Sequence, residues 1–95
     1  MDHYTVFEWD EAKSERNRIK RDLPFRVVVA LFAGFAVTSE DTRRDYGERR
    51  MQVPGMVDDQ VLQCVCTMRG DVCRVISVRR ASRKERNGYY SCKPG

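Results

Sequence analysis

The C-terminal third of the chain carries a dense cluster of side chains that bind phosphate. Residues 79–86 read Arg-Arg-Ala-Ser-Arg-Lys-Glu-Arg, and Tyr89 and Tyr90 follow shortly after them. Guanidinium groups hold phosphate oxygens with two parallel hydrogen bonds, and tyrosine rings stack on nucleobases. Arginine supplies 14 of the 18 basic residues, which favours phosphate geometry over a merely solvating surface. The cluster therefore indicates a nucleic-acid partner.

The charge distribution separates this third from the rest of the chain. Residues 64–95 hold 8 basic and 2 acidic side chains, a net charge of +6, whereas residues 1–63 hold 10 basic and 12 acidic ones, a net charge of −2. A solvated charged surface is the plain alternative, since most charged runs are nothing more. Two features favour a binding surface: the lopsided charge, and arginines that occur inside a strand pattern.

Helical signals stand at both ends of the chain. Asp10 can cap a helix over residues 11–21, and Pro24 can open a second, buried helix that ends before Gly34. Near the C-terminus, Ser82 and Glu85 have the spacing of a capping box, which is also the duller explanation of Glu85. The chain thus predicts two N-terminal helices and one short C-terminal helix.

Alternating patterns between these helices predict about four antiparallel strands. We expect them over residues 35–39, 49–57, 61–68 and 72–79, with turns at 58–59 and 69–71. Pro54-Gly55 marks a bulge or an edge position in the second strand. In the last strand, strict alternation places Arg79 on one face with Cys73, Val75 and Ser77, and Arg80 on the other with Arg74, Ile76 and Val78.

Segregated helices and strands predict an α+β fold in a single domain over residues 1–95, with residues 91–95 as a flexible tail. No apolar run reaches the roughly 20 residues of a membrane span. The N-terminus lacks the basic and apolar regions of a signal peptide, so we expect a cytoplasmic protein with reduced cysteines.

The four cysteines leave two interpretations open. A zinc site built from Cys64, Cys66, Cys73 and Cys92 is conceivable, but the spacing C-x-C-x6-C departs from that of structural zinc sites. We favour small buried apolar residues for the strand cysteines and an incidental free thiol for Cys92. The single histidine, His3, argues against catalysis by paired imidazoles. No metal or cofactor is expected.

Several blocks of the sequence resemble the BrnT toxins of bacterial type II toxin–antitoxin systems. Phe-Glu-Trp-Asp at residues 7–10 and Arg-Arg-Ala-Ser-Arg-Lys-Glu-Arg at residues 79–86 are the most specific. Residues 44–49 (Arg-Asp-Tyr-Gly-Glu-Arg) and 67–70 (Thr-Met-Arg-Gly) also fit, so the similarity spans nearly the whole chain in order.

The resemblance implies a RelE-like fold and a ribonuclease that arrests translation. It also implies that a BrnA-type antitoxin neutralises the toxin, in a heterotetramer of two toxins and an antitoxin dimer. Operator DNA would be contacted only through the antitoxin. Two positions depart from the family pattern. Lys20-Arg21-Asp22 stands where the family has Lys-His-Gly, so that histidine cannot be catalytic here, and Cys66 replaces a tyrosine. The alternative function is a non-catalytic module that binds nucleic acid or antitoxin.

The ribonuclease that the resemblance implies would cut RNA without a metal ion. The 2′-hydroxyl attacks the adjacent phosphate, and the enzyme must align the nucleotide, stabilise added negative charge and move protons. We expect charge stabilisation first from Arg79 and Arg80, and we expect either Tyr89 or Tyr90 to belong to the core. The catalytic candidates are Arg79, Arg80, Lys84, Glu85 and Tyr89, and the RNA-binding candidates are Arg69, Arg74, Arg83, Tyr46, Arg49 and Tyr90, with Glu48 beside them.

Overall fold

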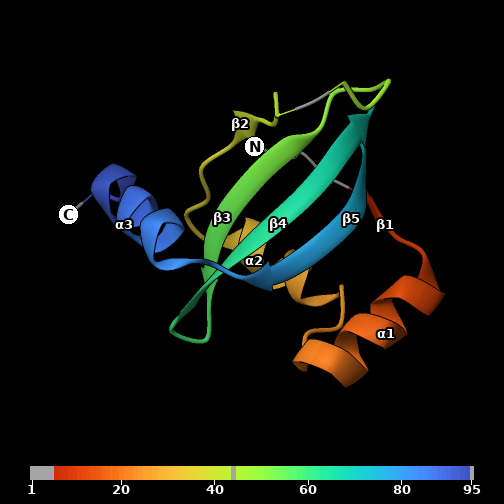
Figure 1. The fold of residues 1–95 in the computed structure, drawn as a ribbon, viewed down its shortest axis with the longest axis horizontal. Helices are drawn as coiled ribbons and strands as arrows, with labels where there is room; N and C mark the ends of the chain where they lie inside the picture. The colour runs from red at the N-terminus through yellow and green to blue at the C-terminus, as the bar shows by residue number, and fades with distance from the viewer. Residues whose placement is uncertain (1–5, 44, 95) are drawn as a thin grey trace.

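A computed structural model describes residues 6–43 and 45–94. His3, and the prediction made from it, fall outside these residues. The elements follow the order β1 (Val6–Glu8), α1 (Glu11–Arg21), α2 (Val27–Ala33), β2 (Ser39–Glu40), β3 (Met51–Val57), β4 (Gln60–Arg69), β5 (Val72–Arg80) and α3 (Arg83–Cys92). The expected α+β class and the three expected helices are confirmed (Figure 1). No described helix is long and apolar enough to cross a membrane.

The sheet corrects the expected strand count and direction. Five described strands are arranged in the order β1-β5-β4-β3-β2, and β1 runs parallel to β5 while the other pairs are antiparallel. Strand β1 has only three residues, and its partner Val72 is 66 positions away from Val6. A strand this short has no readable alternation of its own, and its pairing depends on the tertiary fold.

The capping signals of the two longer helices are confirmed. The Asp10 carboxylate accepts a hydrogen bond from the Lys13 backbone N–H at 3.1 Å and begins α1. At α3, the Ser82 hydroxyl and the Glu85 carboxylate form the complete capping box. The C-cap of α2 is Gly34, as expected, and α3 continues to Cys92, two residues into the expected tail.

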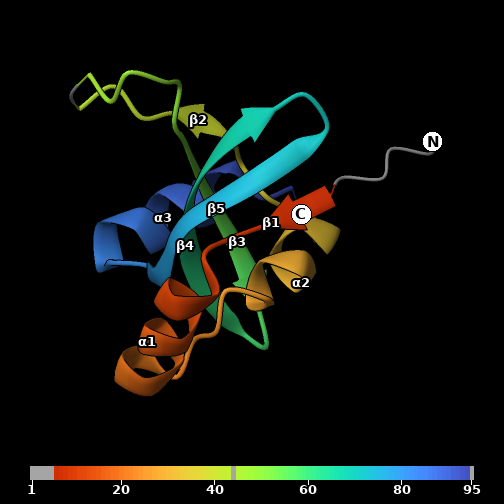
Figure 2. The ribbon, with the colours of Figure 1, turned by 90° about the vertical axis from the view of Figure 1, so that its right-hand side faces the viewer.

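Helix α2 covers one face of the sheet and forms the main core with it. Val28 and Leu31 are fully buried against strand residues that include Val53, Leu62 and Cys64. Gly55 makes this approach possible, because a Cβ at that position would lie 2.7 Å from the Leu31 Cγ. Figure 2 shows α2 on one side of the sheet and α1, α3 and the segment 41–50 toward the other.

A β-bulge in β5 overturns the expected alternation of its side chains. Val65 pairs with Ser77 and Cys66 with Val75, so Ile76 is the extra residue on β5. Arg74, Ser77 and Arg79 consequently share the face of Thr67, Val65 and Gln63, while Arg80 shares the α2-covered face of Leu62. Strict alternation failed because one inserted residue reverses every side chain beyond it.

Backbone hydrogen bonds show how the sheet accommodates Pro54 and what becomes of the strand expected over residues 35–39. β3 pairs with β4 without interruption from Met51 to Val57, so Pro54 causes no bulge. The Pro54 carbonyl accepts from the Val37 N–H at 3.2 Å, which places its backbone groups on the side away from β4, as at an edge. The strand expected over residues 35–39 is reduced to β2 and an isolated bridge between Ala36 and Gly55.

Candidate RNA-binding face

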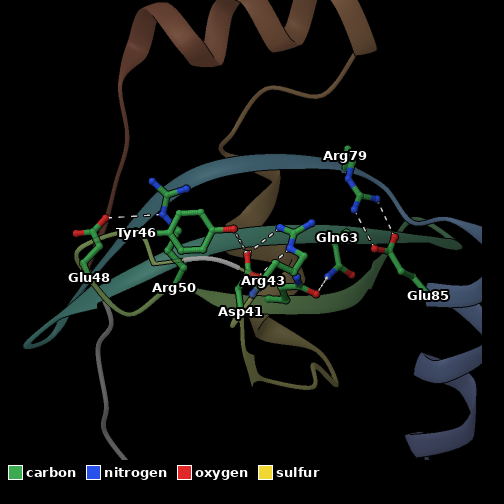
Figure 3. A network of polar contacts seen from close by, with 9 residues as sticks. Asp41, Arg43, Tyr46, Glu48, Arg50, Gln63, Arg79 and Glu85 are labelled. Carbon is green, nitrogen blue, oxygen red and sulfur yellow. Dashed lines mark hydrogen bonds and ion pairs between the residues drawn. The ribbon is translucent and has the colours of Figure 1, made fainter.

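The face of the sheet opposite α2 is the candidate functional site; we call this side, which carries Gln52, Gln63, Ser77 and Arg79, the open face. Helix α3 packs on one end of it, where Tyr89 lies in a small cluster with Val61. The segment 41–50 lies over another part of it (Figure 3). Polar and charged side chains from these elements therefore meet above β3, β4 and β5.

Arg79 and Glu85 form the central ion pair of the open face. Arg79 donates two hydrogen bonds to the Glu85 carboxylate, at 2.7 and 2.9 Å, and Glu85 also accepts from the Ser82 N–H at 2.8 Å. Arg79, followed by Ser82, lowers the pKa of Glu85 to about 2, so this carboxylate is ionised at neutral pH. Glu85 in turn raises the pKa of Arg79.

A second polar cluster comes from the segment 41–50. The buried Asp41 carboxylate accepts hydrogen bonds from the Arg43 side chain at 2.8 and 2.7 Å and from the Tyr46 hydroxyl at 3.0 Å. These bonds, with that of Arg43 first, hold the pKa of Asp41 well below its usual range. A buried, ionised carboxylate thus fixes Arg43, and the charge of Arg43 is felt at Arg79, whose pKa it lowers slightly.

Arg50 continues the cluster toward the β4–β5 hairpin. Its guanidinium lies over the Tyr46 ring, 4.2 Å from the centroid, and its Nε is 4.0 Å from a Glu48 oxygen. The same Glu48 carboxylate accepts a hydrogen bond from Arg69 at 3.2 Å. The Arg50 Nε is buried and has no hydrogen-bond partner within the described residues. Cations therefore extend along the open face from Arg79 to Arg69.

Two glutamines form the floor between these clusters. Gln63 is only 3% exposed, and its amide nitrogen donates to the Gln52 side-chain oxygen at 3.2 Å. The Gln63 side-chain oxygen has no partner within the described part of the chain. Both amides line a pocket of about 160 Å³ that Glu85 and Tyr89 also border. A buried unpaired amide oxygen is costly, so a donor from a ligand would be bound favourably there.

The structure separates the two arginines that were expected to act together. Arg79 lies on the open face, whereas Arg80 donates to the Arg21 carbonyl at 2.6 Å and to the Gln60 side chain at 2.9 Å. Arg80 thus ties the C-terminal end of α1 to the β3–β4 hairpin. The β5 bulge is the cause, since it fixes which of these neighbouring residues faces which side.

Tyr89 is the core member of the tyrosine pair. It is 2% exposed, and its hydroxyl donates to the Phe35 carbonyl at 2.9 Å. Tyr90 is 50% exposed, and its ring packs against the edge of the Tyr89 ring. Because its hydroxyl is engaged inside the fold, we leave Tyr89 out of the reacting groups.

The remaining candidates lie around the open face. Arg74 pairs with Glu8 at 3.7 Å, and Arg49 pairs with Glu40 at 3.3 Å. Arg83 and Lys84 are exposed in the first turn of α3. Tyr46 and Arg69 belong to the clusters already described. The structure thus brings Arg79, Glu85, Tyr46, Arg69 and Arg74 to one face, whereas Arg80 lies on the opposite face and Tyr89 in the core.

The cysteines divide as expected for buried apolar residues and one free thiol. Cys64, Cys66 and Cys73 are buried free thiols, and Cys92 is exposed on α3. The contact with Cys64, together with burial, raises the pKa of Cys66 to about 12, and the contact with Cys66, together with burial, raises the pKa of Cys73. Among residues 6–43 and 45–94, no group of three or more His, Cys, Asp or Glu side chains is arranged to hold a metal ion.

Several residues of the site were missed in the sequence. Asp41, Arg43, Arg50, Gln52 and Gln63 were not candidates, because residues 41–47 have the composition of a polar loop and glutamine gives no pattern. One signal was available: eight of the eleven residues from 40 to 50 are charged, with a tyrosine among them. Such a density of opposite charges beside a strand indicates an ordered network more than a solvated turn.

Comparison with known proteins identifies the family of the chain. A search of the curated proteins found no match. A family model described as ribonuclease toxin, BrnT, of type II toxin–antitoxin system matches residues 9–85. The matched range begins just before α1 and ends at Glu85, so it includes the segment 41–50 and the Arg79–Glu85 pair. The chain belongs to the BrnT family of ribonuclease toxins of type II toxin–antitoxin systems.

Proposed function

We propose that the chain is an endoribonuclease that cleaves RNA on the open face without a metal ion. The observation that carries this proposal is the Arg79–Glu85 pair, which places a cation and an ionised carboxylate side by side in a pocketed, amide-lined face. A guanidinium stabilises a phosphate that gains negative charge, and a carboxylate accepts a proton. The pair thus offers both functions that the cleavage reaction needs.

The reaction is a transfer of the phosphoryl group within the RNA strand. The 2′-oxygen forms a bond to the adjacent phosphorus as its proton passes to the Glu85 carboxylate. The bond from phosphorus to the 5′-oxygen breaks, and that oxygen takes up a proton from water, while Glu85 later releases its proton to the solvent. The products are a 2′,3′-cyclic phosphate and a free 5′-hydroxyl. Arg79 stabilises the phosphate oxygens throughout, and Lys84 and Arg83, which are exposed in the first turn of α3, assist it in this proposal.

Binding of a phosphate to Arg79 would also activate Glu85. While Arg79 donates to both carboxylate oxygens, the pKa of Glu85 stays near 2 and the carboxylate is a poor base. A substrate phosphate that draws the guanidinium toward itself weakens this pairing. The proton affinity of Glu85 then rises toward that of a free carboxylate. The acceptor therefore becomes effective only when substrate is present.

We further propose that the partner is a BrnA-type antitoxin dimer that binds two toxins. A face lined with arginines is blocked most effectively by carboxylates that compete for them or by an ordered segment that covers it. Arrest of translation and growth would follow from RNA cleavage in the cytoplasm. Size-exclusion chromatography with light scattering on the co-expressed pair would give the stoichiometry.

The direct test is to map RNA ends after incubation with pure protein in the presence of a chelator. Cleavage that leaves cyclic phosphates and 5′-hydroxyls, and that is lost in Glu85→Gln, supports the mechanism. Metal-dependent cleavage or 5′-phosphate ends would overturn it. Salt-sensitive RNA binding without any cleavage would instead support the non-catalytic module.

A further inference from the structure

A second cationic surface lies outside the open face, in a groove between α1 and β5. The groove has a volume of about 260 Å³. Its walls include four basic side chains of α1 and the bulge of β5: Lys13, Arg16, Lys20, Arg21, Ile76 and Ser77. The mechanism proposed above uses none of them.

The basic side chains form one stripe because of their spacing. Positions 13, 16, 20 and 21 fall at intervals of three, four and one residues, which keeps them on a single side of a helix. The Asn17 amide fixes that side against the sheet, since it donates to the Val78 carbonyl at 2.9 Å and to the Leu23 carbonyl at 2.7 Å. The rotation of α1, and with it the stripe, is therefore set by the fold.

No ion pair holds the stripe within the described residues. Its charge is felt at the Asp10 carboxylate, whose pKa is lowered by the hydrogen bond from the Lys13 backbone N–H and further by the charges of Arg16 and Lys13. None of its four basic side chains forms an ion pair there, whereas Arg18, which does not line the groove, pairs with Glu15 at 2.7 Å. Helix α1 holds five basic and two acidic residues. On the open face, by contrast, Arg43 and Arg79 each have a carboxylate. An array of unpaired cations along a groove fits an extended polyanion.

The groove leads onto the open face. Ser77 lines the groove and, two residues before Arg79, points to the same side of β5 because the bulge precedes both. Figure 2 shows α1 projecting toward the side of the sheet that also carries α3 and the segment 41–50. A strand whose phosphate lies at Arg79 can therefore pass over Ser77 into the groove.

We propose that this groove binds the sugar–phosphate backbone of the RNA strand that flanks the cleaved nucleotide. The inference rests on the proposed ribonuclease function. From Lys13 to Arg21 the stripe extends about 12 Å at 1.5 Å per residue, which suits a length of strand more than a single phosphate. Contacts of this kind raise affinity for RNA of any sequence and position the strand, without selecting bases.

The test uses the triple variant Lys13→Gln/Arg16→Gln/Lys20→Gln and a control of equal charge, Arg18→Gln/Arg26→Gln/Lys93→Gln, whose three basic residues are exposed and do not line the groove. Binding of a long RNA with 2′-O-methyl groups, which cannot be cleaved, is measured over a range of salt. We expect the groove variant to bind about ten- to a hundredfold more weakly. The slope of log affinity against log salt should fall by about two, because each phosphate that a cation neutralises on a single strand contributes roughly 0.7 to it.

Cleavage assays complete the test. The groove variant should cut a short oligonucleotide centred on the scissile bond as the wild type does, and lose activity only on long RNA. Equal affinity and salt slope in the groove and control variants would overturn the proposal. So would unchanged RNA binding with impaired antitoxin binding, which would make the groove an antitoxin surface. If wild type binds RNA with a groove-dependent slope yet cleaves none, the groove stands and the ribonuclease mechanism fails.

Discussion

Arg79 on β5 and Glu85 on α3 are joined by two hydrogen bonds, of 2.7 and 2.9 Å. Glu85 is also the third residue of α3, and with the N-cap Ser82 it forms the capping box at the start of that helix. One carboxylate therefore fixes a strand arginine and stabilises a helix N-terminus. A ligand that competes for Arg79 acts on both, so phosphate binding and the order of the first turn of α3 are coupled.

Replacement of Arg79 should remove most of the cleavage activity. We expect Arg79→Gln to lower the cleavage rate about 100- to 1000-fold, because it removes a donor that stabilises transition-state charge. Arg79→Lys keeps the charge but not the two parallel hydrogen bonds, so its cleavage rate should lie between those of the wild type and Arg79→Gln. Rates on a labelled RNA, with thermal melting to verify folding, measure the effect. Arg18→Gln, which removes an exposed guanidinium paired on its own helix, is the control; equal rates in all variants would contradict the assignment.

Acid should destabilise the protein through Asp41 and Glu85. Hydrogen bonds to Arg43 and Arg79, respectively, lower the pKa of each carboxyl in the folded state. The unfolded chain therefore takes up protons first, near the ordinary values of 3.8 and 4.5, so stability is present above these values and falls as the pH decreases toward 2. Urea unfolding across this range should show the loss.

Amide variants assign this acid sensitivity. Glu85→Gln and Asp41→Asn should be less stable than wild type at neutral pH, and the difference should shrink as the pH falls. A difference that stays constant with pH would show that the two carboxyls do not cause the acid sensitivity.

We expect the Gln63 side chain to serve ligand binding while lowering the free energy of unfolding. Its buried side-chain oxygen has no partner within residues 6–43 and 45–94. Replacement by Met, which has a similar length and no amide, should leave the free energy of unfolding unchanged or raise it by about 1 kcal/mol. RNA cleavage should nonetheless fall or change its sequence preference. A Gln63→Met variant that is markedly less stable and equally active would contradict this view.

Local signals in the sequence were sufficient for most helices and for the hairpin positions. Asp10 and the Ser82–Glu85 capping box act within a few residues of themselves, so their chemistry can be recognised without the fold. The turn between β4 and β5 is likewise local, and Gly70 there has a φ of 63°. These positions allowed α1, α3 and the ends of β4 to be predicted closely.

The site depends on features that no short segment contains. The pairing of β1 with β5, the extra residue Ile76 and the return of residues 41–50 over the sheet are all set by tertiary contacts. The bulge alone decides that Arg79 and not Arg80 reaches the open face. The cationic region can be located from the sequence, but which of its arginines face the same side depends on the register of β5.

Asp22 provides a test of the backbone at the C-terminal end of α1. It ends α1 in the left-handed conformation, with φ 59° and ψ 35°, and its N–H donates to the Arg18 carbonyl at 2.9 Å. Glycine adopts this conformation without strain, and a negative charge is unfavourable at a helix C-terminus. We expect Asp22→Gly to raise the free energy of unfolding by about 0.5–1.5 kcal/mol, measured by urea denaturation. Asp22→Asn removes only the charge, so its free energy of unfolding should rise less. Asp22→Ala keeps a Cβ in the left-handed conformation, so its free energy of unfolding should rise least. The same stability in all three variants would show that the left-handed backbone of Asp22 carries no cost.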